Sequence, residues 1–144
     1  MSLDDLYKEV ILDHYKSPRN KRGLPEATVS LHKNNPLCGD EITVHARLGD
    51  GRVAEIAFEG QGCSISQASA SMMTEAVQGL STEDAGGLAG EFRGMMEGRV
   101  DPDEDQFGDL MALKGVVKYP VRIKCAVLAW DVLEDALRES GPAG

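Results

Sequence analysis

The chain has 144 residues, of which 42% are hydrophobic, 27% are charged and only 5% are aromatic, and its formal net charge is −9. This length suffices for one domain with a core of its own. A protein that binds duplex nucleic acid needs clustered Lys and Arg to displace counterions, and no such cluster is visible. No apolar run reaches the roughly 18 residues of a membrane span, and the opening MSLDDLYKEV lacks the features of a signal peptide. We therefore expect a cytoplasmic protein without a nucleic-acid or membrane partner.

The pattern of apolar residues predicts helices and strands in a definite order. Helical spacing over residues 3–15 predicts an amphipathic helix. Alternation then predicts three strands, over 27–33, 41–48 and 52–58, with a tight turn at Asp50 and Gly51 between the last two. Further helices are expected over 64–79, 82–98 and 120–139, the last beginning at Pro120. Strands followed by helices predict an α+β fold, in which helices cover one face of a three-stranded antiparallel sheet. We expect a single domain, 1–144, with a loose tail over 140–144.

The three cysteines are Cys38, Cys63 and Cys125, and their odd number and wide spacing argue against a disulfide framework. Judged by residue type alone, all three could be buried structural thiols. Their surroundings indicate more. Cys38 lies in a Pro/Gly loop two residues before Asp40, Cys63 follows GQG directly before a helix, and Cys125 lies near the start of the last helix. Helix N-termini and nearby cations favour the thiolate, which is the form that binds metal or attacks sulfur.

Asp40 adds a carboxylate to this group. Gly39 permits a tight bend, so that the side chains of Cys38 and Asp40 can point toward one place. Three thiolates and a carboxylate form a four-ligand set that suits zinc or an iron–sulfur cluster. The alternative for Asp40 is a turn residue that bonds its own backbone. Arg122 and Lys124 on the last helix would offset negative charge at such a site, or else face solvent.

The three histidines give weaker indications. His14 lies on the apolar side of the first helix, and we expect it to pack there. His32 and His45 lie in adjacent strands, where a histidine is usually solvated or hydrogen-bonded. Either of them with Cys38 could make a cysteine hydrolase, because such enzymes need a base close to the thiol. The sequence shows no oxyanion-hole signature, however, and this alternative leaves the other two cysteines unexplained.

Three motifs together make the chain resemble the U-type, IscU/NifU-like family of iron–sulfur cluster assembly proteins. They are CGD at 38–40, GQGCSIS at 60–66 and GVVKYPVRIKCAVLAW at 115–130. The resemblance extends from LYKEVILDHYKSPRN near the start to the last helix, and it implies a SufE/IscU-like fold. Lys124 stands where the scaffold branch has a histidine, and residues 99–119 supply a segment that the SufU branch inserts before its third cysteine. The chain thus resembles the SufU branch.

This resemblance implies a zinc site formed by Cys38, Asp40, Cys63 and Cys125. It also implies a partner, a pyridoxal-phosphate cysteine desulfurase of the SufS type, with Cys38 as the catalytic sulfur acceptor. The implied function is that of a zinc-dependent sulfurtransferase, which accepts persulfide sulfur and passes it to downstream iron–sulfur scaffold proteins. Two alternatives remain: a scaffold on which a [2Fe-2S] cluster is assembled by the same four side chains, and a structural zinc site without catalysis.

Overall fold

The computed structural model of the chain describes residues 3–36 and 39–139. Helix α1 (Leu3–Lys16) is followed by strands β1 (Val29–Asn35), β2 (Asp40–Gly49) and β3 (Arg52–Gln61), helices α2 (Ser64–Val77), α3 (Thr82–Met96) and α4 (Glu104–Phe107), the 3-10 helix η1 (Gly108–Lys118), and helix α5 (Pro120–Glu139). The α+β class is confirmed, and so is every helix and strand that the apolar pattern predicted, with ends shifted by a few residues. None of the helices in residues 3–36 and 39–139 has both the length and the hydropathy of a membrane span.

The sheet is a simple antiparallel meander with the order β1-β2-β3. Val44 at its centre pairs with Leu31 of β1 on one side and with Phe58 of β3 on the other. The β2–β3 turn falls at Asp50 and Gly51, as predicted, and both residues have positive φ, 55° and 72°. Such a turn follows the right-handed twist of the strands that it joins. The turn therefore holds the strands in the register that buries one face of β2.

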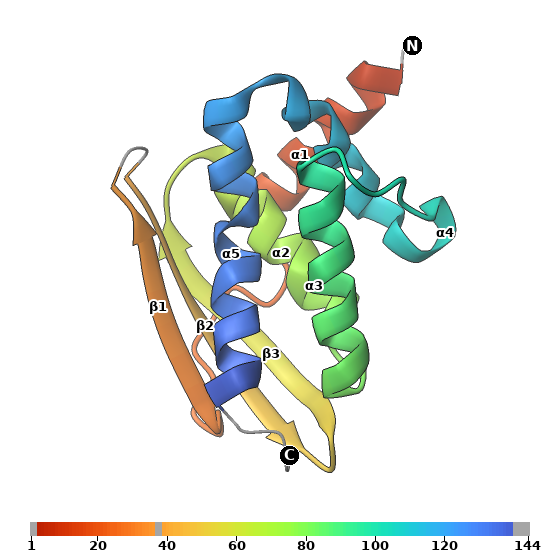
Figure 1. The fold of residues 1–144 in the computed structure, drawn as a ribbon. Helices are drawn as coiled ribbons and strands as arrows, with labels where there is room; N and C mark the ends of the chain where they lie inside the picture. The colour runs from red at the N-terminus through yellow and green to blue at the C-terminus, as the bar shows by residue number, and fades with distance from the viewer. Residues whose placement is uncertain (1–2, 37–38, 140–144) are drawn as a thin grey trace.

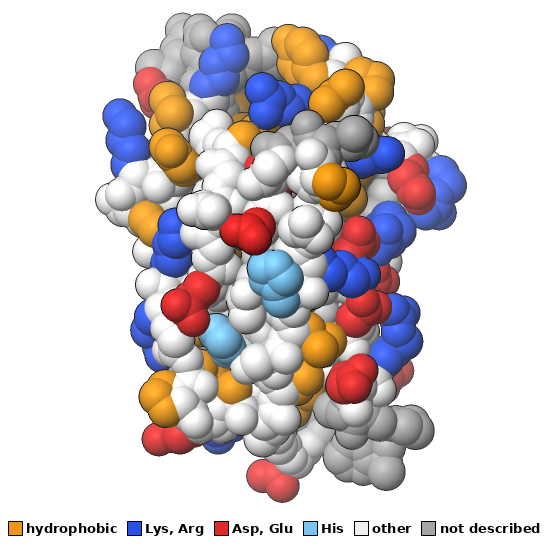
Figure 2. Space-filling model, turned by 90° about the vertical axis from the view of Figure 1, so that its left-hand side faces the viewer, with side chains coloured by type: hydrophobic (Ala, Val, Ile, Leu, Met, Phe, Trp, Pro, Cys, Tyr) orange, Lys and Arg blue, Asp and Glu red, His pale blue; other side chains and the backbone are white. Residues whose placement is uncertain are grey.

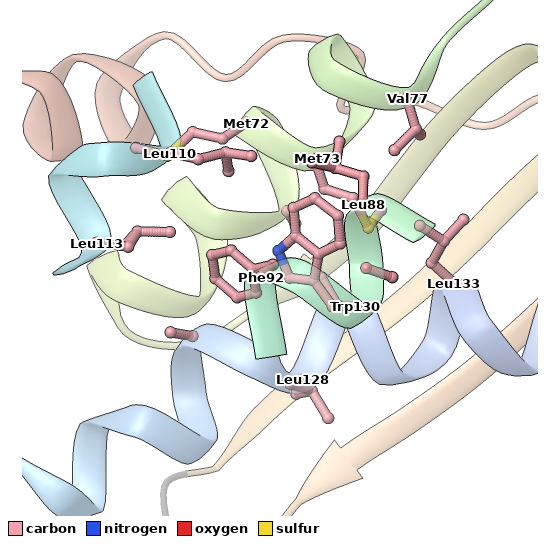
Figure 3. Packing of buried hydrophobic residues seen from close by; sticks show 14 of the residues in the cluster. Met72, Met73, Val77, Leu88, Phe92, Leu110, Leu113, Leu128, Trp130 and Leu133 are labelled. Carbon is pink, nitrogen blue, oxygen red and sulfur yellow. The ribbon is translucent and has the colours of Figure 1, made fainter. Parts of the chain in front are cut away.

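Helices α2, α3 and α5 cover this buried face of the sheet (Figure 1), and α5 packs against both β1 and β2. The apolar core begins between the sheet and the helices and continues among the helices (Figure 3). Among the helices, the rings of Phe92 from α3 and Trp130 from α5 stack with their centroids 4.6 Å apart. The indole Nε1–H of Trp130 donates to Ser69 Oγ over 3.2 Å, which satisfies the one polar group of this buried side chain. The hydrogen bond holds α5 against α2, and the stacked rings hold it against α3.

The opposite face of the sheet is open to solvent and polar, and histidine lies near its middle (Figure 2). His45 contacts Ser30 Oγ at 2.7 Å and Glu59 Oε1 at 2.8 Å. The Nδ1 atom of His32 lies 2.9 Å from Thr43 Oγ1. Both histidines are thus hydrogen-bonded side chains of the exposed face, as expected.

Residues 99–119 contain two short helices, α4 and η1, that the apolar pattern did not predict. The side chain of Asp103 caps α4 by accepting a bond from the backbone N–H of Asp105. Phe107 and Leu113 are buried, and η1 packs against α1 and α5. The segment therefore contributes to the core instead of forming an open loop. The predicted tail, residues 140–144, lies outside the described residues.

Replacement of Leu133 tests the importance of the packing of α5 in the apolar core. Leu133 on α5 is completely buried, so Leu133→Ala should lower the free energy of unfolding by about 2–5 kcal/mol. Leu12→Ala is the matched control, because Leu12 is 45% exposed and its loss should cost no more than about 0.5 kcal/mol. Urea unfolding followed by circular dichroism measures both. Equal losses in the two variants would contradict this description of the core.

Candidate metal centre

Three of the four ligands predicted from the sequence lie together at one end of the helical layer. Atoms of Asp40, Cys63 and Cys125 that could bind a metal ion all lie within 4.8 Å of one another. They come from the first residue of β2, the residue that caps α2, and the beginning of α5, and these ends meet near the top of Figure 1. The fourth predicted ligand, Cys38, lies outside the described residues.

Asp40 is the best-anchored member of this group. Its side chain is fully buried, and its Oδ1 accepts a 2.8 Å hydrogen bond from the backbone N–H of Cys63. Its other oxygen, Oδ2, lies 3.9 Å from the sulfur of Cys63. This bond joins residues 23 positions apart in the chain, unlike the local turn bond that was the alternative for an aspartate here. Because a bond to an ionised carboxylate is stronger than one between neutral groups, it holds the carboxylate toward the thiols.

Two glycines make this close approach possible. Gly39 has a φ of +71°, consistent with the sharp bend expected before Asp40, and its N–H donates to Asn35 O over 2.9 Å. Gly62 has a φ of +149°, and a Cβ there would lie 2.9 Å from the Cα of Asp40 and collide with its Oδ1. Only glycine leaves room for the carboxylate. The sequence shows glycines around Cys63 but does not reveal which distant side chain needs the space.

The two described thiols occupy different surroundings. Cys63 is the N-cap of α2, as its position before a helix suggested, and its sulfur accepts from the backbone N–H of Ser66 at 3.4 Å. A helix N-terminus favours negative charge at this position. The Cys63 residue is partly exposed. Cys125 is fully buried, with its sulfur 3.9 Å from the carbonyl oxygen of Val121 one turn earlier. Neither thiol forms a disulfide.

Arg122 places a positive charge beside both thiols. The negative charge of Cys63, followed by that of Cys125, raises the pKa of the Arg122 guanidinium above its ordinary value. Arg122 can thus offset part of the charge that two thiolates and a carboxylate would bring together. Lys124, the other cation considered from the sequence, has an exposed side chain.

The chemistry and spacing of this group fit a zinc ion. Zinc binds cysteine sulfur at about 2.3 Å and carboxylate oxygen at about 2.0–2.2 Å, so the ligand atoms of one site lie roughly 3.5 Å apart. The 3.9 Å between Asp40 Oδ2 and the Cys63 sulfur is close to this separation. A tetrahedral structural site has four ligands, and Cys38 is the predicted fourth.

Comparison with known proteins gives one family for nearly the whole chain. Residues 6–139 match the family described as "NifU-like N terminal domain". The zinc-dependent sulfurtransferase SufU of Bacillus subtilis is 48% identical over 141 residues, which cover 97% of this chain and 95% of that protein. The iron–sulfur cluster assembly scaffold protein IscU of Streptococcus pyogenes is 42% identical over 98% of this chain and 88% of its own length.

Solved structures agree with this relationship. The crystal structure of a putative iron–sulfur cluster assembly scaffold protein for the SUF system from Fervidobacterium islandicum superimposes with a TM-score of 0.86. It is 32% identical, and the match covers 95% of this chain and all of the other. A NifU-like protein from Brucella abortus has a TM-score of 0.85 at 26% identity, over 95% of each chain. The predicted resemblance to U-type assembly proteins is therefore confirmed.

The contact between Gly62 and Asp40 can be tested by adding one methyl group. Gly62→Ala should displace the Asp40 carboxylate and sharply lower the zinc retained per chain, measured by elemental analysis after gel filtration. Gly87→Ala is the control, because Gly87 lies in α3 with nothing within 4 Å of the added carbon. That change should leave zinc content unaltered and should, if anything, stabilise the helix. Full zinc retention by the Gly62 variant would show that the carboxylate is not needed.

Proposed function

The chain belongs to the NifU-like N-terminal domain family, and we propose that it is a zinc-dependent sulfurtransferase. In this proposal it accepts persulfide sulfur from a cysteine desulfurase and passes the sulfur on for iron–sulfur cluster assembly. The observation that carries the proposal is the meeting of Asp40, Cys63 and Cys125 in one small volume. The name of the Bacillus subtilis relative, a zinc-dependent sulfurtransferase, supports the choice of zinc and of sulfur transfer.

Asp40, Cys63 and Cys125 would hold the zinc ion, with Cys38 as the fourth ligand. When bound, zinc keeps its cysteine ligands deprotonated by Lewis acidity. Asp40 is fixed by its hydrogen bond to the Cys63 backbone, and Cys125 is fully buried in the second turn of α5. These two residues would stay in place and define the site, while Arg122 offsets its negative charge.

Cys38 would be the residue that accepts sulfur, because in the sequence it lies between Pro36 and Gly39 in the β1–β2 connection, and a ligand from a loop can leave the metal with less disruption than one from a helix. The Cys38 thiolate attacks the outer sulfur of a persulfide on the desulfurase cysteine. A new sulfur–sulfur bond forms on Cys38, the bond between the two sulfurs of the donor breaks, and the desulfurase cysteine leaves as a thiolate. This is ordinary thiol–disulfide exchange chemistry and needs no further oxidant or reductant.

The partner in this scheme is a pyridoxal-phosphate cysteine desulfurase of the SufS type, and a downstream scaffold protein would receive the sulfur. The desulfurase must bring its persulfide to the end of the molecule where α2 and α5 begin. Tyr119 and Val121 are exposed at this end, 62% and 67% respectively. Such apolar side chains beside the cationic Arg122 would offer the partner both hydrophobic contact and charge.

A second candidate function is a scaffold on which a [2Fe-2S] cluster is built. It is favoured by the IscU name of the Streptococcus pyogenes relative and by donors that also suit iron–sulfur clusters. The position before Cys125 carries Lys124, whose side chain is exposed, in place of a histidine that could bind iron. Anaerobic addition of iron and sulfide to the zinc-loaded protein should therefore produce no cluster absorption. A stable cluster chromophore with loss of zinc would favour the scaffold.

Mass spectrometry of the peptides of this protein tests whether Cys38 is the residue that accepts sulfur. After incubation with a SufS-type desulfurase and cysteine, one additional sulfur atom should appear on the peptide that contains Cys38. Cys38→Ser should abolish both this gain and the stimulation of the desulfurase, while Glu83→Gln, a change at an exposed side chain in α3, which begins at the opposite end of the helical layer (Figure 1), should alter neither. Sulfur that accumulated instead on Cys63 or Cys125 would overturn the assignment of Cys38.

A further inference from the structure

His14 belongs to a second cluster that is separate from the cysteine centre. The residue is completely buried in α1, and its Nδ1 lies 2.8 Å from Ser71 Oγ on α2. Ser71 Oγ also accepts a 2.8 Å hydrogen bond from the backbone N–H of Arg19. The imidazole is thus held in one orientation, although the sequence predicted only a packing role for it.

The other ring nitrogen of His14 faces two carboxylates. Its Nε2 lies 2.9 Å from Asp109 Oδ2 in η1 and 3.8 Å from Glu75 Oε1 in α2. The three candidate ligand atoms all lie within 4.8 Å of one another. The Asp109 and Glu75 side chains are 60% and 49% exposed. A buried nitrogen and two solvent-accessible carboxylates therefore meet at the junction of α1, α2 and η1.

We propose that His14, Glu75 and Asp109 bind a divalent transition-metal ion. Bonds of about 2.0–2.2 Å from one ion to nitrogen and oxygen place neighbouring ligand atoms roughly 3.0–3.6 Å apart. The distances from Nε2, 2.9 Å and 3.8 Å, lie close to both ends of this range, so small side-chain rotations bring all three ligands to one ion.

Ser71 supplies the outer contact that a metal-bound histidine requires. A ligating imidazole is neutral and usually donates its other N–H to a neighbouring acceptor, which fixes its orientation. Here Nδ1–H would donate to Ser71 Oγ, whose two lone pairs accept from His14 and from the Arg19 backbone together. This arrangement leaves the Nε2 lone pair directed at the ion.

The charges of the cluster also suit a divalent cation. The two carboxylates together balance a charge of +2 on the ion. The guanidinium of Arg19 is close, but it bonds Asp13 at 2.7 Å and lies 4.0 Å from Glu75. Its hydrogen bond with Asp13 is the main cause that raises the pKa of Arg19. Arg19 is therefore engaged mainly by Asp13, and its longer ion pair with Glu75 balances only part of the negative charge of the cluster.

The donor set distinguishes this site from the cysteine centre. One nitrogen and two oxygens, without sulfur, suit ions such as zinc, cobalt, iron(II) or manganese. Because both carboxylates are exposed, water molecules can occupy the remaining coordination positions of the ion. A bound ion would hold η1 against α1 and α2. Helix η1 leads directly into α5, which carries Cys125.

Cobalt(II) titration of the protein that retains zinc in its cysteine centre tests this site. Thiolates hold zinc more strongly than cobalt, so added cobalt should fill the second site. We expect one further equivalent with weak visible bands and without the intense sulfur-to-cobalt charge-transfer band. Asp109→Asn and Glu75→Gln should each weaken its binding by about tenfold or more. These two variants change exposed side chains. They therefore test the site even if a third variant, His14→Gln, which changes a buried side chain, does not fold.

His45→Gln is the matched control, because His45 also contacts a carboxylate, Glu59, at 2.8 Å, but lies on the open face of the sheet. It should bind cobalt as tightly as the unchanged protein. The proposal is overturned if no further equivalent binds, if all bound cobalt shows the charge-transfer band, or if the Asp109 and Glu75 variants bind like the control. These outcomes do not depend on sulfur transfer, so this proposal and the proposed function can fail separately.

Discussion

The hydrogen bond from the Cys63 backbone to the Asp40 carboxylate is the constraint on which the predicted metal centre depends. It connects the start of β2 to the junction between β3 and α2, so a change in either element moves a ligand. Burial of an ionised carboxylate is costly unless the charge is paired or binds a metal. Asp40 is fully buried and lies beside two thiols. The site thus concentrates negative charge that a metal ion and Arg122 can balance.

The rest of the fold holds the predicted ligands of this centre to different degrees. Cys125 is held because it is fully buried and because the stacked rings of Phe92 and Trp130 anchor its helix, α5. Cys63 is held by a helix cap but remains partly exposed. Such a centre can keep a metal in place while one ligand exchanges, which is the property that sulfur transfer through Cys38 would require.

Much of this architecture could be predicted from local patterns. Alternation from Ile42 to Ala46 shows a strand with one buried face, and all three apolar residues of that stretch are buried. The placement of Cys63 directly before a helix followed from the small residues after it. These predictions succeeded because the period of the apolar residues reports which face of an element is buried. The segment 99–119 was missed because short 3-10 and α-turns interrupted by glycine give no sustained period.

The remaining features depend on contacts between residues far apart in the chain. Nothing near Gly62 in sequence shows that Asp40 needs the space of its missing side chain. The position of His14 on the apolar side of α1 predicted burial, which the structure has, but its bond to Asp109 spans 95 residues. Local periodicity carries no information about such pairs.

X-ray absorption at the zinc edge of the purified protein tests the proposed centre most directly. The ligand set Cys38, Asp40, Cys63 and Cys125 predicts three sulfur atoms at about 2.3 Å and one oxygen at about 2.0–2.2 Å from the ion. Zinc in the Cys38→Ser variant should lose one of these sulfur neighbours. A first shell of the unchanged protein with fewer than three sulfur atoms, or one dominated by histidine nitrogen, would contradict this ligand set.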